Sequence, residues 1–75
     1  MEALVETIVK ALVDYPEDVR VEKEATDQVD IFKLHVHADD TGKVIGKHGK
    51  VAKSMRIVMN AAAVQSSKRV QLEIL

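Results

Sequence analysis

Hydrophobic residues recur at two different spacings along the first half of the chain, and the change in spacing separates a helix from a hairpin. In residues 3–14, apolar side chains return every three or four positions, which predicts a helix that ends before Pro16. Residues 19–24 and the segment around Phe32 instead alternate apolar and polar side chains, as half-buried strands do. A polar turn at 26–28 joins the two strands, so a β-hairpin is expected.

The second half of the chain predicts two helices separated by glycines, followed by a third strand. A short helix is expected at about 40–46, with Asp39 and Asp40 as caps of its N-terminus. A longer helix is expected at about 50–66, and the alternation in 70–74 predicts a strand. The apolar stripe expected to face inward on the longer helix consists of Val51, Met55, Val58, Met59 and Ala62.

This order of elements predicts an α+β fold. Each strand must bury one face and each helix one stripe, and packing three helices on one face of a three-stranded sheet satisfies both requirements. With 75 residues, of which 47% are hydrophobic, the chain is long enough for one core. We therefore expect residues 1–75 to form a single domain.

Composition excludes several classes of function. The chain has no cysteine, which excludes disulfides, thiolate chemistry and cysteine-based zinc sites. Its aromatic residues are Tyr15 and Phe32, too few for a stacking platform. No stretch approaches the length of about 20 apolar residues that spans a membrane, and the N-terminus does not resemble a signal peptide, so the cytoplasm is the expected location.

Charge is distributed unevenly although the formal net charge is only −1. Residues 42–56 contain five basic and no acidic residues, so this segment carries +5 and the remaining 60 residues carry −6. Seven acidic residues lie within 14–30. One basic segment on an otherwise acidic chain favours a directed contact with an anion over diffuse binding to polyanions.

At the centre of the basic segment, Gly46 and Gly49 flank Lys47 and His48 between the two predicted helices. Glycine adopts backbone angles closed to other residues and permits close approach, and a helix that begins after Gly49 directs N–H groups and partial positive charge at the loop. The spacing differs from that of a Walker loop. The candidate binding residues of this segment are Lys43, Val44, Gly46, Lys47, His48, Gly49, Lys50 and Lys53.

The loop with its flanks, Val44–Lys50, resembles the signature of the KH RNA-binding domain, in which a GxxG loop clamps the nucleic-acid backbone. The order of elements resembles the type II arrangement of KH domains. Segments Asp14–Val19 and Asp39–Gly46 are especially similar to the small bacterial KH proteins of the KhpA (YlqC) family. The resemblance extends over essentially the whole chain.

This resemblance implies a type II KH domain that binds single-stranded RNA, acts as an RNA chaperone or regulator, and has no enzymatic activity or cofactor. It implies partners too: a second copy of the chain, or a larger KH protein of the KhpB/Jag type, with links to cell division, cell elongation and cell shape. Val44 and Ile45 match the apolar lead-in to the loop, with Ile45 expected in the core. The chain has Ala38 where the family commonly has proline, and His48 in the loop, whose charge depends on pH.

A second apolar stripe on the 50–66 helix lies opposite the expected core stripe and is a candidate partner interface. The alternative is scattered surface apolar residues, which are ordinary. A related alternative for the whole protein is an adaptor that binds other proteins and has little RNA binding of its own. The stripe consists of Ile57, Ala61 and Val64.

Two further clusters carry weaker signals. His35 and His37 lie two residues apart on one strand, but no third ligand is evident, so no metal site is expected. Asp39 and Asp40 could form an acidic catalytic pair, but helix capping is the favoured interpretation.

Overall fold

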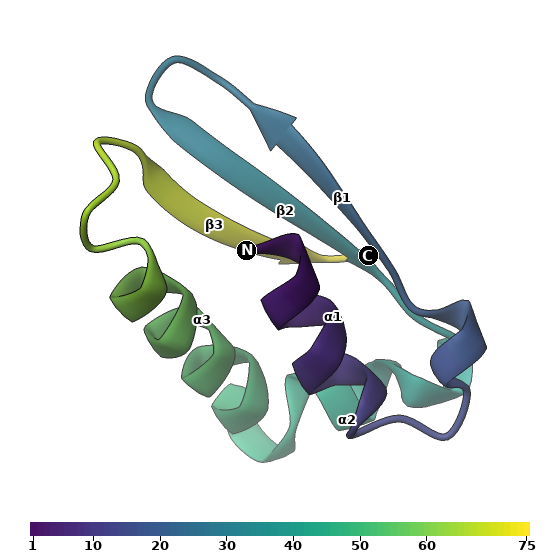
Figure 1. Ribbon diagram of the computed structural model, residues 1–75. Coiled ribbons are helices and arrows are strands. Elements are labelled where there is room, and N and C mark those ends of the chain that lie inside the picture. The colour runs from purple at the N-terminus through teal and green to yellow at the C-terminus, as the bar shows by residue number, and fades with distance from the viewer.

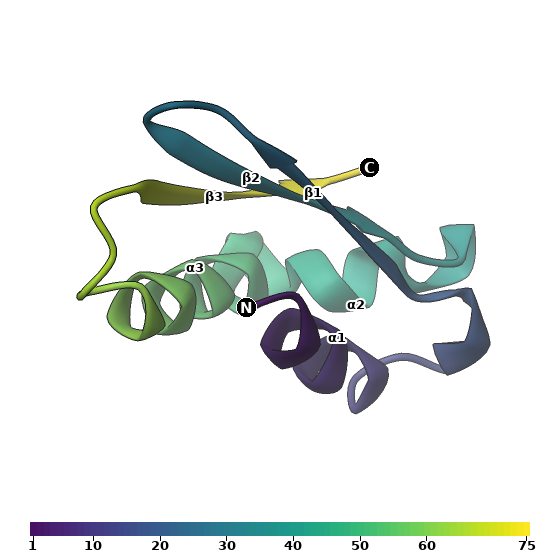
Figure 2. The ribbon, with the colours of Figure 1, turned by 45° about the horizontal axis from the view of Figure 1, so that its top comes forward.

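The computed structural model describes residues 1–75 as an α+β fold with all three helices on one face of a three-stranded sheet, as predicted (Figures 1 and 2). No helix is both long and apolar enough to cross a membrane. The helices are α1 (Glu2–Lys10), α2 (Thr41–Ile45) and α3 (Lys50–Ala62). The strands are β1 (Arg20–Ala25), β2 (Val29–His35) and β3 (Arg69–Ile74).

The sheet is mixed, with β2 between an antiparallel β1 and a parallel β3. The hairpin turn between β1 and β2 is closed by Thr26, whose hydroxyl donates to the carbonyl oxygen of Val29 at 2.9 Å and accepts from its N–H at 3.0 Å. Phe32 on β2 pairs with Leu72 on β3, and both side chains are buried. The parallel pairing requires the chain to cross over through α2 and α3, which places the α2–α3 loop at the end of the helical layer (Figure 1).

One cluster of buried apolar side chains joins the sheet to the helices. The alternation predicted for β2 is confirmed, because Phe32 and Leu34 are buried in this cluster. Partly buried residues, among them Val21, Val36 and Ile74, extend it along the sheet. The cluster consists of Val5, Val9, Phe32, Leu34, Val44, Met55, Met59 and Leu72.

Helix α3 differs from its prediction in length and in rotation. It ends at Ala62 rather than near residue 66. Ala52 is buried with Met55 and Met59, whereas Val58 is exposed, so the predicted inward role of Val58 is wrong. The predicted inward role of Ala62, in the last turn, is also wrong, because this residue is exposed. The apolar residues of α3 allow more than one rotation, and tertiary packing selects the one that buries Ala52.

Asp40 does not cap helix α2 in the predicted way. No side chain caps this helix. Instead, the fully buried Asp40 carboxylate accepts hydrogen bonds from the backbone N–H groups of Asp14 at 3.1 Å and Tyr15 at 3.0 Å. Burial alone would raise the pKa of Asp40, but these N–H groups and Lys43 hold it below its ordinary value. Asp40 thereby ties the segment after α1 to the start of α2.

The histidines of β2 and the segment after it have separate roles. The ring of His37 stacks on Tyr15 with centroids 4.0 Å apart, and its Nδ1 accepts a hydrogen bond from the N–H of Asp39 at 3.0 Å. His35 lies 3.0 Å from a carboxylate oxygen of Glu22 on β1. No group of three or more potential metal-ligating side chains forms around either histidine or elsewhere.

Candidate functional site

The loop between α2 and α3 is a tight turn in which three of four residues have positive φ. Gly46, His48 and Gly49 have φ values of 78°, 57° and 74°. The N–H of Gly49 donates to the carbonyl oxygen of Gly46 at 3.1 Å and closes the turn. A left-handed conformation costs a non-glycine residue about 1–2 kcal/mol. The turn therefore holds His48 in a strained conformation, and it leaves the side chains of His48 and Lys47 exposed.

The two loop glycines are required for different reasons. At Gly46, with φ 78° and ψ 171°, the backbone lies in a region that essentially only glycine occupies. A β-carbon there would also lie 2.4 Å from Cγ2 of Val51, so the space is already filled. At Gly49 the backbone is left-handed, but a β-carbon would meet nothing within 4 Å. The open side of the loop is therefore at Gly49, where a ligand can approach the backbone.

The lysines around this loop are the only lysines of the chain without carboxylate partners. Lys47, Lys50 and Lys53 form no ion pair. All three are exposed, and they follow one another from the loop onto the first turns of α3. Their charges are therefore available to an external anion. The paired lysines are Lys10, Lys23, Lys33, Lys43 and Lys68.

Two of the predicted contact residues, Lys43 and Val44, are engaged within the protein: Lys43 in ion pairs and Val44 in the core. Lys43 pairs with Asp14 and lies 3.5 Å from the Asp40 carboxylate. Its hydrogen bond to Asp14 raises the pKa of Lys43, an effect that desolvation opposes and the charge of Asp40 reinforces. Val44 is fully buried, whereas Ile45 is 39% exposed, so the expected positions of these two residues are exchanged. The side chain of Val44 thus belongs to the core and cannot face a ligand.

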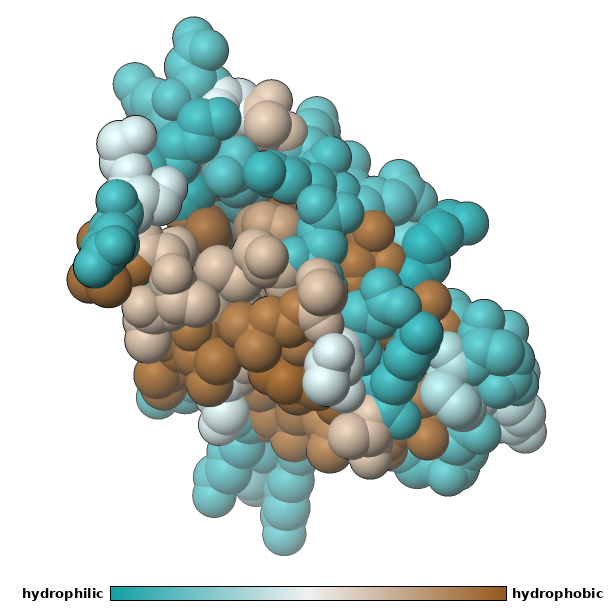
Figure 3. Space-filling model, viewed as in Figure 1, coloured by the Kyte–Doolittle hydropathy of each residue, from teal (hydrophilic) through white to brown (hydrophobic).

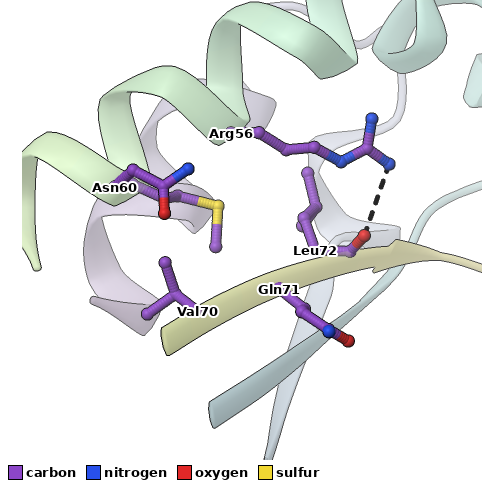
Figure 4. Close-up of a pocket in the computed structure, with 6 residues that line it drawn as sticks. Arg56, Asn60, Val70, Gln71 and Leu72 are labelled. Carbon is purple, nitrogen blue, oxygen red and sulfur yellow. Dashed lines mark hydrogen bonds between the residues drawn. The ribbon is translucent and has the colours of Figure 1, made fainter. Parts of the chain in front are cut away.

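A cleft of about 260 Å³ lies between α3 and β3 (Figure 4). Its floor is apolar and comes from Met59, Val70 and Leu72. Arg56 extends from α3 across the cleft and donates to the carbonyl oxygen of Leu72 at 3.4 Å. Asn60, one turn further along α3, lies at the rim. The cleft thus combines an apolar floor with a cation and a carboxamide on one wall.

A second, more apolar groove lies between α1 and α3, and its volume is about 310 Å³. Apolar side chains gather over these two helices, and hydrophilic side chains project where α3 begins (Figure 3). Leu12 and Val58 at its edges are 43% and 42% exposed. The groove is lined by Ile8, Leu12, Lys50, Val51, Ser54, Met55 and Val58.

The stripe predicted as a partner interface is exposed. Ile57 and Val64 are 60% and 79% exposed, and Ala61 lies between them on the surface. At 100° per residue, Ile57 and Ala61 adjoin Val58 on the surface of α3. Ile57 and Ala61 therefore extend the apolar surface of the α1–α3 groove along α3, whereas Val64 lies beyond the end of this helix at Ala62.

Sequence reasoning did not locate the α3–β3 cleft, and it missed the α1–α3 groove. The residues that line the cleft, such as Asn60 and Val70, come from elements that only the tertiary fold brings together. The groove was missed because Val58 was assigned to the core. A clear local signal existed only for Arg56, which ends the run of basic residues that begins at Lys43.

Comparisons with known proteins agree with the resemblance to KH domains drawn from the sequence. Residues 2–74 match the family model described as the KH domain of KhpA/KhpB. The chain is 55% identical over 74 residues to the RNA-binding protein KhpA of Bacillus subtilis, covering 99% of this chain and 91% of that protein. It is 49% identical to the RNA-binding protein KhpA of Clostridium acetobutylicum and 45% identical to that of Oceanobacillus iheyensis, over the full length of each. No solved structure matches the chain significantly.

Proposed function

The chain belongs to the KhpA/KhpB family of KH domains, and from this we propose that residues 1–75 act as a single KH domain that binds single-stranded RNA at the α2–α3 loop. The relatives named above are RNA-binding proteins, which supports this assignment. RNA binding of this kind requires no catalytic step and no cofactor.

The observation that carries the proposal is the placement of the unpaired lysines around an open glycine loop. Lys47, Lys50 and Lys53 offer uncompensated charge beside the accessible backbone at Gly49. A phosphodiester backbone supplies successive anions to such a row and can approach the loop where no β-carbon intervenes. His48 adds a hydrogen-bonding group on the same turn. In this arrangement the lysines contribute to the affinity for RNA but do not distinguish one base sequence from another.

We place the bases of the bound strand in the α3–β3 cleft. Single-stranded recognition exposes base faces, which bind to apolar surfaces, and base edges, which bind to hydrogen-bonding groups. The floor of Met59, Val70 and Leu72 suits the faces, and Arg56 and Asn60 suit the edges. The site therefore holds the strand by its phosphates at the loop and by its bases in the cleft.

We also propose that the continuous apolar surface of α1 and α3 binds a second copy of the chain, or the KH domain of a KhpB/Jag-type protein. A small domain gains stability by covering such a surface, and a symmetric dimer presents the same patch twice. On α3, Val58 lies on one flank of the buried stripe, whereas Arg56 and Asn60 lie on the other. The base cleft and the partner surface therefore lie on different flanks of α3, and a dimer gains avidity for RNAs with two sites.

In the cell, this proposal places the protein among RNA regulators of the cytoplasm with links to cell division and elongation. That role comes from the family resemblance. The adaptor function is the second candidate, favoured by the exposed Ile57 and Val64, and it predicts partner binding without RNA binding.

Fluorescence anisotropy with short labelled single-stranded RNAs, at two salt concentrations, tests the RNA proposal. Three phosphate contacts predict a slope of log K against log salt of about −2, so a rise from 50 to 200 mM salt weakens binding about 20-fold. The double variant Lys47→Asp/His48→Asp should abolish binding while keeping the turn, because aspartate tolerates positive φ.

The matched control is Lys10→Asp/Gln28→Asp, which introduces the same change of charge at exposed positions away from the loop. It should bind as the wild type does, or nearly so. If both double variants lose binding equally, net charge rather than the loop governs the interaction. If the folded wild type binds no RNA, the adaptor function takes its place.

A further inference from the structure

Val51 belongs both to the RNA-binding loop and to the partner groove. On one side, its Cγ2 lies 2.4 Å from where a β-carbon on Gly46 would be, so the valine packs directly on the loop backbone. On the other side, Val51 lines the α1–α3 groove together with Met55 and Val58. The three heavy atoms nearest to that position all belong to Val51.

The position of Val51 determines the geometry of the loop. Gly46 has a backbone conformation that only glycine readily adopts, and Val51 fills the space beside it. The backbone nitrogen of Val51 is also among the nearest atoms, at 2.8 Å from that β-carbon position. Any movement of Val51 therefore shifts both the Gly46 turn and the first turn of α3, which together form the phosphate site.

The stiffness of the valine side chain makes it suited to transmit a contact. A β-branched side chain in a helix strongly prefers one χ1 rotamer, so it moves with its backbone rather than independently of it. Val51 is half-buried, and the groove in front of it is open, with Leu12 and Val58 exposed at its edges. A partner that fills the groove would contact Val51 and restrict its position beside Gly46.

We propose that dimerisation through the α1–α3 groove strengthens RNA binding at the loop, with Val51 as the positioning residue that couples the two. The coupling rests on the RNA and dimer functions proposed above. A second copy in the groove restricts Val51 and the first turn of α3. RNA then binds a loop that is already ordered, so binding loses less conformational entropy. By linkage, RNA must then strengthen the dimer by the same factor for each RNA bound.

An opposite effect, in which dimerisation weakens RNA binding, would act through Lys50. Its side chain also lines the groove, and it is one of the unpaired lysines proposed to bind phosphate. A partner that drew this ammonium group into the groove would weaken RNA binding. The sign of the coupling therefore distinguishes ordering through Val51 from competition for Lys50.

The test uses a labelled pentanucleotide RNA of mixed sequence, which is too short to engage two loops, so avidity does not contribute. Its affinity is measured by anisotropy for the wild-type dimer and for two groove variants, Val58→Glu and Val58→Lys, whose oligomeric state is checked by light scattering. Both variants should be monomeric and bind about fivefold more weakly. Because they carry opposite charges, a loss common to both is not electrostatic.

Two further measurements sharpen the result. The pentanucleotide should lower the dissociation constant of the wild-type dimer by the same factor of about five per RNA bound. Val51→Ala should remain dimeric, but the difference in RNA affinity between its dimer and its monomer should fall below twofold. Val51→Ile, which keeps the β-branch, should preserve the fivefold difference.

Equal or weaker affinity in the dimer would overturn the coupling and leave the proposed RNA function standing. A monomeric wild type that binds RNA would do the same. A dimeric wild type that binds no RNA would refute the proposed function, and the coupling with it.

Discussion

Val51 fills the space beside Gly46 that the β-carbon of any other residue would need. That atom would lie 2.4 Å from Cγ2 and 2.8 Å from the backbone nitrogen of Val51, closer than real β-carbons approach. Gly49 has a similar φ but open space beside it. The two glycines of the loop thus have unequal roles: Gly46 is required for packing within the protein, and Gly49 leaves room for a ligand.

Alanine substitutions should separate these roles. We expect Gly46→Ala to reduce the free energy of unfolding by about 2–3 kcal/mol, and Gly49→Ala by about 1 kcal/mol, because both strain the backbone and only the first also overlaps Val51. Urea unfolding followed by circular dichroism measures both. In a Val51→Ala background the cost of Gly46→Ala should shrink. Equal costs at the two glycines would contradict this account.

Salt dependence should identify which lysines contact phosphate. Neutralising Lys47, Lys50 or Lys53 with methionine should each reduce the slope of log K against log salt by about 0.7, the contribution of one contact on a single strand. Lys43→Met should leave the slope unchanged, because Lys43 already pairs with Asp14 and Asp40. Anisotropy titrations across several salt concentrations test this, and a reduced slope for Lys43→Met would show that its ion pairs open on binding.

Asp40 should make the fold sensitive to acid. The pKa of Asp40 is lowered in the folded protein, so as pH falls the unfolded chain takes up the proton first, near the ordinary value of 3.8. The stabilisation is complete above that value and is lost as pH falls through the lower folded pKa. Thermal melts from neutral pH to below pH 3 should show a steeper loss in the wild type than in Asp40→Asn, which should already be less stable at neutral pH. Asp27→Asn, at an exposed position in the hairpin turn, should follow the wild type.

A charge in the exposed stripe of α3 should disrupt self-association. Ile57→Glu is expected to give a folded monomer, because Ile57 is 60% exposed and contributes little to the core. Light scattering should show the mass of the dimer for the wild type and for Gln71→Glu, which adds the same charge on the opposite face of the sheet. A dimer that survives Ile57→Glu would place the interface elsewhere on the surface.

The sequence predicted those features of the fold that depend on local periodicity. Strand β2 buries Phe32 and Leu34 as its alternation indicates, because side chains alternate between faces wherever a strand lies in a sheet. The rotation of α3 was predicted less well. Its apolar residues extend more than halfway around the helix, and only the tertiary packing decides that Ala52 is buried and Val58 is exposed.

The same division applies to the candidate site. Gly46 and Gly49 with their neighbouring lysines are adjacent in the sequence, so the loop could be recognised from it. The partner of Lys43 is Asp14, 29 residues away, and a lysine with such a partner cannot be distinguished from a free one by composition. The cleft between Asn60 and Val70 likewise exists only once α3 and β3 pack.

The unpaired lysines at the start of α3 give the molecule an electric dipole. The segment 42–56 carries +5 and the remainder of the chain −6, so the domain is nearly neutral from a distance but strongly polarised at close range. In the field of an approaching polyanion such a dipole turns the loop toward the strand before contact. The charge distribution therefore orients the protein relative to the polyanion as well as attracting it. At physiological ionic strength the screening length is about 8 Å, so this orientation acts only when the two molecules are nearly in contact. It therefore affects the orientation in which they bind more than the distance over which they attract each other.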